Sequence, residues 1–207
     1  MSTSVSTGPT PPYYDARATA RSAGSGYLTA EPGTWVFILG DLLVFGAYFL
    51  LYLYSRGQDP DTFTASQRAL SPTVGTFYTL LLLVSSLFVV AALRAVRAGR
   101  RTLSSRLILA AMGCGLAFLI LKVVEYSTKV DQGVVPTTNS FFMYFFVLTG
   151  LHLFHLIVGL GLLTMVFALV RRTETTGRTT WIESGCCIWH LIDLLWIVIF
   201  PLLYFVR

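Results

Sequence analysis

Ionisable side chains interrupt stretches of this sequence that are otherwise apolar. They are Asp41, Lys122, Glu125, His152, His155, Glu183, His190 and Asp193. An ionisable group at the centre of a membrane helix costs at least about 2.5 kcal/mol on insertion scales, so each should face protein or water. Histidines near carboxylates are also the residue types that bind metals, and paired histidines can ligate a haem.

The spacing of these residues predicts which of them share a helix face. Lys122 and Glu125 lie three residues apart, which predicts an internal ion pair between them. His190 and Asp193 have the same spacing near the middle of the last apolar stretch. Glu183 precedes His190 by a little under two helical turns, close to the predicted cytoplasmic end of that stretch.

The three histidines allow two interpretations. His152, His155 and His190 could supply a three-histidine metal site, or two of them a haem pair across helices. Haem ligation between helices needs small residues around each ligand, and only Gly150 and Gly159 provide them. We therefore favour an interhelical network in which each histidine bonds a neighbouring carboxylate or carbonyl, with no catalytic residue and no metal site.

Asp41 stands alone in the first apolar stretch and has two interpretations that the sequence leaves open. It is either a structural acceptor that pairs with His152, His190 or Lys122, or a protonatable acid with a role in function. An isolated acid with no local cation favours the functional reading as much as the structural one.

The composition explains what must position these side chains. Of the 207 residues, 55% are hydrophobic and 12% are charged, whereas a soluble domain carries about 25% charged residues. A membrane helix needs about 20 apolar residues, and five stretches qualify. They are 34–54, 74–93, 103–126, 141–170 and 181–205. We predict an all-α polytopic bundle over residues 31–207, preceded by a disordered cytoplasmic tail at 1–30 that is rich in Ser, Thr, Pro and Gly.

Basic residues in the loops predict the orientation. One side of the membrane receives Arg17, Arg21, Arg94, Arg97, Arg100, Arg101, Arg106, Arg171, Arg172 and Arg178; the other receives Arg56, Arg68, Lys129 and Arg207. The positive-inside rule then puts the amino terminus in the cytoplasm and the carboxyl terminus outside. The basic residues are scattered over several loops and do not form one patch. Despite the net charge of +5, this distribution argues against nucleic-acid binding.

Two further features of the apolar stretches concern packing. Cys114, Cys186 and Cys187 lie inside them without the spacing of a zinc site or a disulfide framework. Small residues recur in the third and fourth stretches, at Ala111, Gly115, Gly150, Gly159 and Gly161. Such residues let helix backbones approach closely, which predicts a compact bundle or docking onto a larger partner.

The polar residues fall within a longer ordered pattern. The fourth stretch contains Phe141, Phe142, Thr149, Gly150, His152, His155 and Gly159. The fifth contains Glu183, Trp189, His190, Asp193 and Trp196, the third contains Glu125 and Tyr126, and the first contains an acid six residues after Trp35. In order and spacing, this set resembles subunit III of the haem–copper terminal oxidases, over roughly 34–207.

The resemblance implies a subunit with no redox centre of its own. Haem and copper would belong to partner subunits, the catalytic subunit I and subunit II, of a proton-pumping cytochrome c oxidase in a bacterial plasma membrane. The chain would stabilise subunit I, hold phospholipid and support proton uptake. Some arginines are candidate contacts for anionic lipid, although they also suffice simply to set topology. They are Arg97, Arg100, Arg101, Arg171 and Arg172.

Departures from the family pattern leave the complex open. Asp41 stands where most cytochrome c oxidase members have glutamate, and Cys186 and Cys187 lie in a region that is usually aromatic. Five-helix relatives also occur in ubiquinol oxidases and beside nitric oxide reductase, and both remain alternatives. A small transporter or channel with Asp41 and the histidines along its path is a more distant one.

Overall fold

The computed structural model describes residues 32–172 and 179–206, and helices joined by short connections make up this part of the chain. The helices are α2 (Pro32–Gln58), α3 (Pro60–Gln67), α4 (Pro72–Arg97), α5 (Arg101–Asp131), α6 (Ser140–Arg171) and α7 (Thr179–Tyr204). No strand occurs in this part of the chain, which confirms the predicted all-α class. The predicted tail at 1–30 lies outside the described residues.

Five of these helices are long and apolar enough to cross a membrane, as predicted. Each contains one of the five predicted stretches almost entirely. Helix α5, with 31 residues, extends five residues past the end of its predicted stretch, whereas α6 exceeds its own by one residue at each end. Proline occupies the first turn of α3 and of α4, where its missing N–H costs nothing. Asn139 caps α6 by accepting a hydrogen bond from the Phe142 N–H at 2.9 Å.

The short helix α3 was not predicted from the sequence. It is capped by Asp59, whose side chain accepts a hydrogen bond from the Thr62 N–H, and it buries Phe63. Its Gln67 amide donates to the backbone carbonyls of Leu203 and Val206 near the end of the chain, at 3.2 and 2.9 Å. The helix therefore ties the α2–α4 connection to the end of α7, which hydropathy alone does not reveal.

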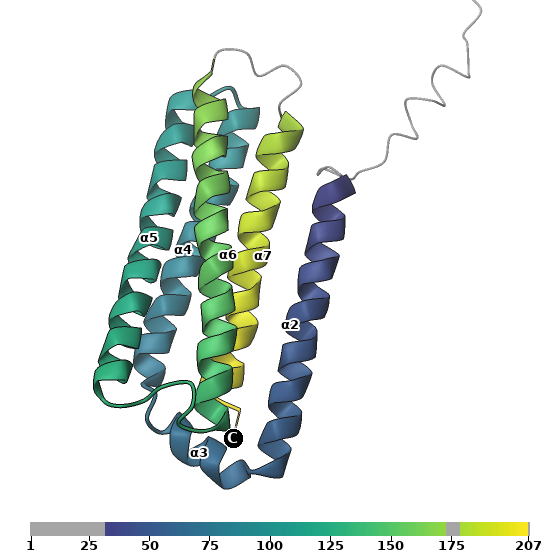
Figure 1. Ribbon diagram of the computed structural model, residues 1–207. Helices are drawn as coiled ribbons and strands as arrows, with labels where there is room; N and C mark the ends of the chain where they lie inside the picture. Colours follow the sequence, from purple (N-terminus) through teal and green to yellow (C-terminus); the bar gives the residue numbers. More distant parts are fainter. Residues whose placement is uncertain (1–31, 173–178, 207) are drawn as a thin grey trace, which may run out of the picture.

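The helices differ strongly in how far they enter the bundle. In Figure 1, α4, α5, α6 and α7 run side by side, and α2 stands at the edge next to α7. In α7, 56% of the most apolar 18-residue segment is buried inside the protein, whereas in α2 the corresponding share is 17%. The core therefore lies around α7, and α2 presents most of its apolar surface to the outside.

Two glycines and one serine let α7 and α4 approach α5 and α6. A Cβ on Gly115 would lie 2.7 Å from the Trp189 ring, and one on Gly159 would lie 2.6 Å from Ile192. The Ser85 hydroxyl donates to the Ala111 carbonyl at 3.0 Å. The prediction of close packing is confirmed at these positions. At Gly161 a Cβ would meet nothing within 4 Å, so this glycine is not needed for packing inside the bundle, and the alternative of docking onto a partner stays a prediction there.

Candidate functional site

Lys122 forms the centre of a polar cluster between α4, α5 and α7. Its ammonium group lies 2.8 Å from Glu125 Oε2, and its side chain has no exposed surface. The ammonium also lies over the rings of Trp196, Tyr78 and Phe145, at 4.7, 4.8 and 5.5 Å from their centroids. The predicted ion pair is confirmed, and aromatic faces surround the cation on the sides that the carboxylate does not reach.

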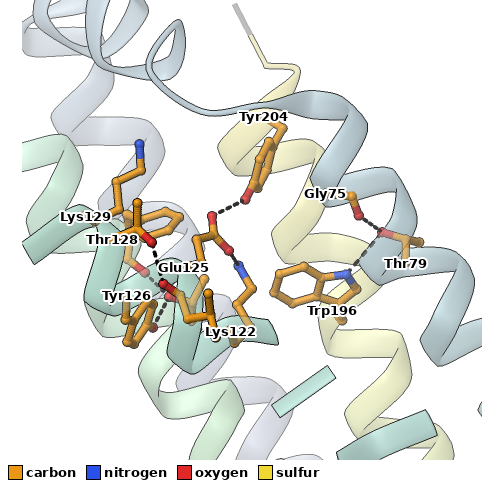
Figure 2. A network of polar contacts seen from close by, with 12 residues as sticks. Gly75, Thr79, Lys122, Glu125, Tyr126, Thr128, Lys129, Trp196 and Tyr204 are labelled. Carbon is orange, nitrogen blue, oxygen red and sulfur yellow. Dashed lines mark hydrogen bonds and ion pairs between the residues drawn. The ribbon is translucent and has the colours of Figure 1, made fainter. Parts of the chain in front are cut away.

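Glu125 links this cluster to the end of α7. The Tyr204 hydroxyl donates to its second oxygen, Oε1, at 3.3 Å, so the carboxylate bridges Lys122 and Tyr204 (Figure 2). Beside it, the Trp196 indole N–H donates to the Thr79 hydroxyl at 3.1 Å, and that hydroxyl donates to the Gly75 carbonyl at 2.9 Å. Helices α4, α5 and α7 are therefore fixed to one another by groups that all have partners.

His152 is equally buried but has a different environment. Its ring packs against Phe118 and Trp196, with centroids 5.7 and 5.2 Å away. Neither ring nitrogen has a hydrogen-bond partner among the described residues. The expectation that each histidine bonds a carboxylate or carbonyl is therefore wrong for His152, whose ring contacts aromatic side chains in place of an acceptor.

Asp41 pairs with a histidine that was not among its expected partners. Its Oδ1 lies 3.0 Å from His155 Nε2, and His155 Nδ1 lies 2.8 Å from the Leu151 carbonyl oxygen. The expected pairing with His152, His190 or Lys122 is wrong, because the edge position of α2 brings Asp41 to the α6 face that carries His155. Asp41 Oδ2 is buried and has no partner in the part of the chain that the structure describes.

His190 and Asp193 lie on the face of α7 that meets α4. The Ser86 hydroxyl contacts His190 Nδ1 at 2.6 Å, so the partner of this histidine is a hydroxyl and not the expected carboxylate or carbonyl. Asp193 is buried, and within 32–172 and 179–206 neither of its oxygens has a hydrogen-bond partner of normal geometry. The residue before His190, Trp189, donates from its indole N–H to the Ser85 hydroxyl at 3.2 Å.

Two contacts in the site were missed by sequence reasoning. Glu183 Oε1 lies 2.8 Å from Arg97 Nη2, which joins the end of α4 to the start of α7. The hydroxyls of Tyr126 and Thr149 also bond, which joins α5 to α6. Opposite charges at one membrane face could have indicated the first pair. Nothing in the sequence indicates the second, because it depends on how two helices are rotated.

The three histidines have separate environments, one facing α2, one enclosed by rings and one bonded to α4. No group of three His, Cys, Asp or Glu side chains within the described ranges is placed to hold a metal ion. The arrangement is suited to fixing helix order, because most of its polar groups join one helix to another. Asp41 and Asp193 each keep at least one buried carboxyl oxygen that no other described group satisfies.

A model of the family "Cytochrome c oxidase subunit III" matches residues 28–207. The chain belongs to this family. The subunit 3 of cytochrome c oxidase from Thermostichus vulcanus is 34% identical to it over 183 residues, which cover 83% of this chain and 85% of the relative. A cytochrome bo(3) ubiquinol oxidase subunit 3 from Buchnera aphidicola and a probable quinol oxidase subunit 3 from Staphylococcus haemolyticus are each 28% identical. These two matches cover 83% and 84% of this chain, and 84% and 87% of the relatives.

Membership of the subunit III family explains the ordered pattern of polar residues. The chain is a membrane subunit III of the haem–copper oxidase kind, and the family has no redox centre of its own. Polar contacts connect all five long helices. Asp41 with His155 joins α2 to α6, and the Thr149 and Tyr126 hydroxyls join α6 to α5. Glu125 with Tyr204 joins α5 to α7, and His190 with Ser86 joins α7 to α4. Several residues of the family pattern therefore take part in contacts between helices.

Proposed function

We propose that this chain is the non-redox subunit III of a proton-pumping cytochrome c oxidase. It stabilises catalytic subunit I, associates with the complex that includes subunit II, and supports proton uptake during aerobic electron transport. The haem and copper belong to those partner subunits. Family membership and the 34% identity to a cytochrome c oxidase subunit 3 support this proposal.

The observation that carries the proposal is that Lys122 and Asp41, two ionisable groups of the membrane interior, are paired inside the bundle. Lys122 is neutralised by Glu125 within α5, and Asp41 is held by His155 of α6. A transporter needs polar groups along a path that ions can follow, whereas the Lys122 cluster is closed by aromatic rings. The arrangement therefore favours a rigid supporting subunit.

Affinity purification of the tagged chain from its native membrane tests the proposal directly. We expect mass spectrometry to identify oxidase subunits I and II, and the reduced sample to show the absorption bands of their haems. A tagged unrelated membrane protein of similar size is the control. Recovery of the chain without any oxidase subunit, together with ion flux by the purified chain in proteoliposomes, would refute a supporting role.

A second candidate is subunit III of a quinol oxidase. It is favoured by the matches to the ubiquinol oxidase and quinol oxidase subunits from Buchnera aphidicola and Staphylococcus haemolyticus. The same purified complex distinguishes the two candidates, since oxygen consumption would depend on reduced cytochrome c in one case and on quinol in the other. An association with nitric oxide reductase would instead appear as co-purified reductase subunits.

We also propose that the chain lies in a bacterial plasma membrane with its amino terminus in the cytoplasm. The α4–α5 connection and the end of α6 carry arginines and lie at the same end of the bundle, away from α3 (Figure 1). Ala98, which is exposed in that connection, is a suitable site for a reporter cysteine in a chain that lacks its own three. A membrane-impermeant thiol reagent should label it in inverted vesicles and not in intact cells.

Replacing Asp41 with Asn tests a role in proton uptake. The Asn side-chain amide can still form a hydrogen bond with His155 Nε2, so we expect the complex to assemble and to keep its initial rate. Loss of the protonatable group should lower sustained turnover or shorten the active lifetime of the oxidase, measured as oxygen consumption over many turnovers. Wild-type behaviour in sustained turnover would leave Asp41 with a structural role alone.

A further inference from the structure

A recess of about 170 Å³ lies between α2, α4 and α7. Its lining residues include Trp35 of α2, Arg97 of α4, and Glu183, Cys187 and His190 of α7. It therefore opens at the end of the bundle where α4 ends and α2 and α7 begin (Figure 1). One water molecule occupies about 30 Å³ in the liquid, so the recess has room for several.

The mouth of the recess is polar and its charges balance. The Arg97 side chain is 56% exposed, and its guanidinium lies 2.8 Å from the Glu183 carboxylate. Because these two groups neutralise each other, the mouth carries no unpaired charge that would select an anion. No three His, Cys, Asp or Glu side chains in the described parts of the chain are placed to hold a metal ion. Water is therefore the ligand that this recess fits.

His190 forms the inner end of the recess. It lies seven residues after Glu183, which places it about 10 Å deeper along the axis of α7. Its Nδ1 lies 2.6 Å from the Ser86 hydroxyl. Its Nε2 forms no hydrogen bond with the described residues and is not among the atoms that the protein encloses. One ring nitrogen is thus accessible from the recess, and the other is bonded to α4.

A carboxyl group without a partner lies beyond Ser86. Asp193, one turn after His190, is 4% exposed. Neither of its oxygens has a hydrogen-bond partner of normal geometry among residues 32–172 and 179–206, and the Ser86 hydroxyl faces it. A buried carboxylate without partners is costly, so this group requires a proton or a water molecule. His190 and Ser86 stand between it and the recess.

We propose that the recess is an aqueous inlet and that His190 and Ser86 carry a proton from it to Asp193. A hydronium ion in the recess gives its proton to Nε2, the Nδ1 proton passes to the Ser86 hydroxyl oxygen, and the hydroxyl proton passes to the carboxylate. The hydronium ion becomes water, the carboxylate becomes a carboxylic acid, and the imidazole changes from one neutral tautomer to the other. No oxidant or reductant is needed.

The route ends inside the membrane. Trp196, one turn beyond Asp193, has no exposed surface and closes it. Lys122 and Asp41, two other ionisable groups of the interior, each have a charged or histidine partner of their own. Asp193 is therefore a reversible proton site and not part of a channel. The inference goes beyond the proposed function, because it concerns this chain alone and holds whichever oxidase contains it.

Infrared spectroscopy of the full-length chain in nanodiscs tests the relay. The C=O stretch of protonated Asp193 is the band that Asp193→Asn removes, and its shift after transfer to heavy water measures how fast the carboxyl proton exchanges. A positioned acid–base group accelerates proton transfer about 100-fold or more, so His190→Phe should slow this exchange about 100-fold. His152→Leu, at a buried histidine outside the recess, should leave the rate unchanged.

A second variant separates the inlet from the relay. Cys187→Phe fills the recess from its wall and leaves His190 in place, so it should also slow the exchange. Gly113→Phe is the control, since it adds the same ring on α5 where a Cβ meets nothing within 4 Å. Loosened packing would expose Asp193 and speed the exchange, so misfolding cannot imitate the expected result.

Three outcomes would overturn the proposal. Unchanged or faster exchange in His190→Phe would exclude the histidine as the relay. Unchanged exchange in Cys187→Phe would exclude the recess as the entrance. A wild-type Asp193 band that does not exchange at all would exclude both.

Discussion

Lys122 and His152 lie against the same indole ring, yet their surroundings have little else in common. Both side chains are without exposed surface, and both pack on Trp196. Lys122 has a carboxylate at 2.8 Å and three aromatic rings around its ammonium group. His152 has aromatic rings around it and no hydrogen-bond partner among the described residues.

The comparison shows that a polar residue inside a membrane helix can be retained for opposite reasons. An ammonium group cannot be buried alone, so Lys122 is accompanied by Glu125 and by Tyr204 beyond it. An imidazole ring can also pack as a flat aromatic body, edge to face with Phe118. A single substitution in the Lys122 environment should therefore destabilise the protein, whereas the His152 environment should accept a nonpolar replacement.

The largest expected effect is that of Glu125→Gln. It leaves the Lys122 ammonium group buried without its counter-ion, so we expect a loss of about 3–5 kcal/mol in the free energy of unfolding. Unfolding in mixed micelles with increasing SDS, followed by circular dichroism, measures this loss. Asp131→Asn is the control, since it removes a carboxylate from the exposed end of the same helix and should cost less than about 0.5 kcal/mol.

A double variant separates the ion pair from general damage to the site. Lys122→Met/Glu125→Leu replaces both charged groups with apolar side chains of similar size, so it should be more stable than Glu125→Gln alone. A double variant that is as unstable as the single one would contradict the view that an unpaired charge causes the loss. It would instead assign the stability to the contacts of Lys122 with Tyr78 and Trp196.

The same contrast shows what sequence reasoning can reach. The ion pair of Lys122 and Glu125 was predictable because it is local, with its geometry set by one helical turn. The five long helices were predictable because span length is set by membrane thickness. The partner of Asp41 was predicted wrongly, because it depends on where α2 stands relative to α6.

Other features escaped prediction for related reasons. Helix α3 has eight residues and a mixed composition, so neither hydropathy nor length identifies it. The pair of Arg97 and Glu183 joins residues 86 positions apart. The missing hydrogen-bond partner of His152 follows from how α5, α6 and α7 are rotated about their axes. Local spacing predicted what lies within one helix, and packing determined what lies between helices.

Gly115→Ala alters the packing that brings α5, and with it Lys122, to α7. The added methyl group would lie 2.7 Å from the Trp189 ring, a rigid neighbour in the core, so we expect a loss of about 1–3 kcal/mol. Gly113→Ala is the matched control on the same helix, where nothing lies within 4 Å and alanine should be neutral or stabilising by up to about 1 kcal/mol. Equal stability of the two variants would show that α5 does not depend on this close approach.

The smallest effect is expected for His152→Leu, and its sign differs from the others. Leucine removes two buried nitrogens that have no partner in the described chain, so the variant should be unchanged or more stable by up to about 1 kcal/mol. His155→Leu is the control, because it leaves Asp41 without its partner and should destabilise by about 1–3 kcal/mol. Destabilisation by His152→Leu as large as that of His155→Leu would mean that His152 acts as a hydrogen-bonding group. Lys122 and His152, which both pack on Trp196, would then be alike in requiring a polar partner.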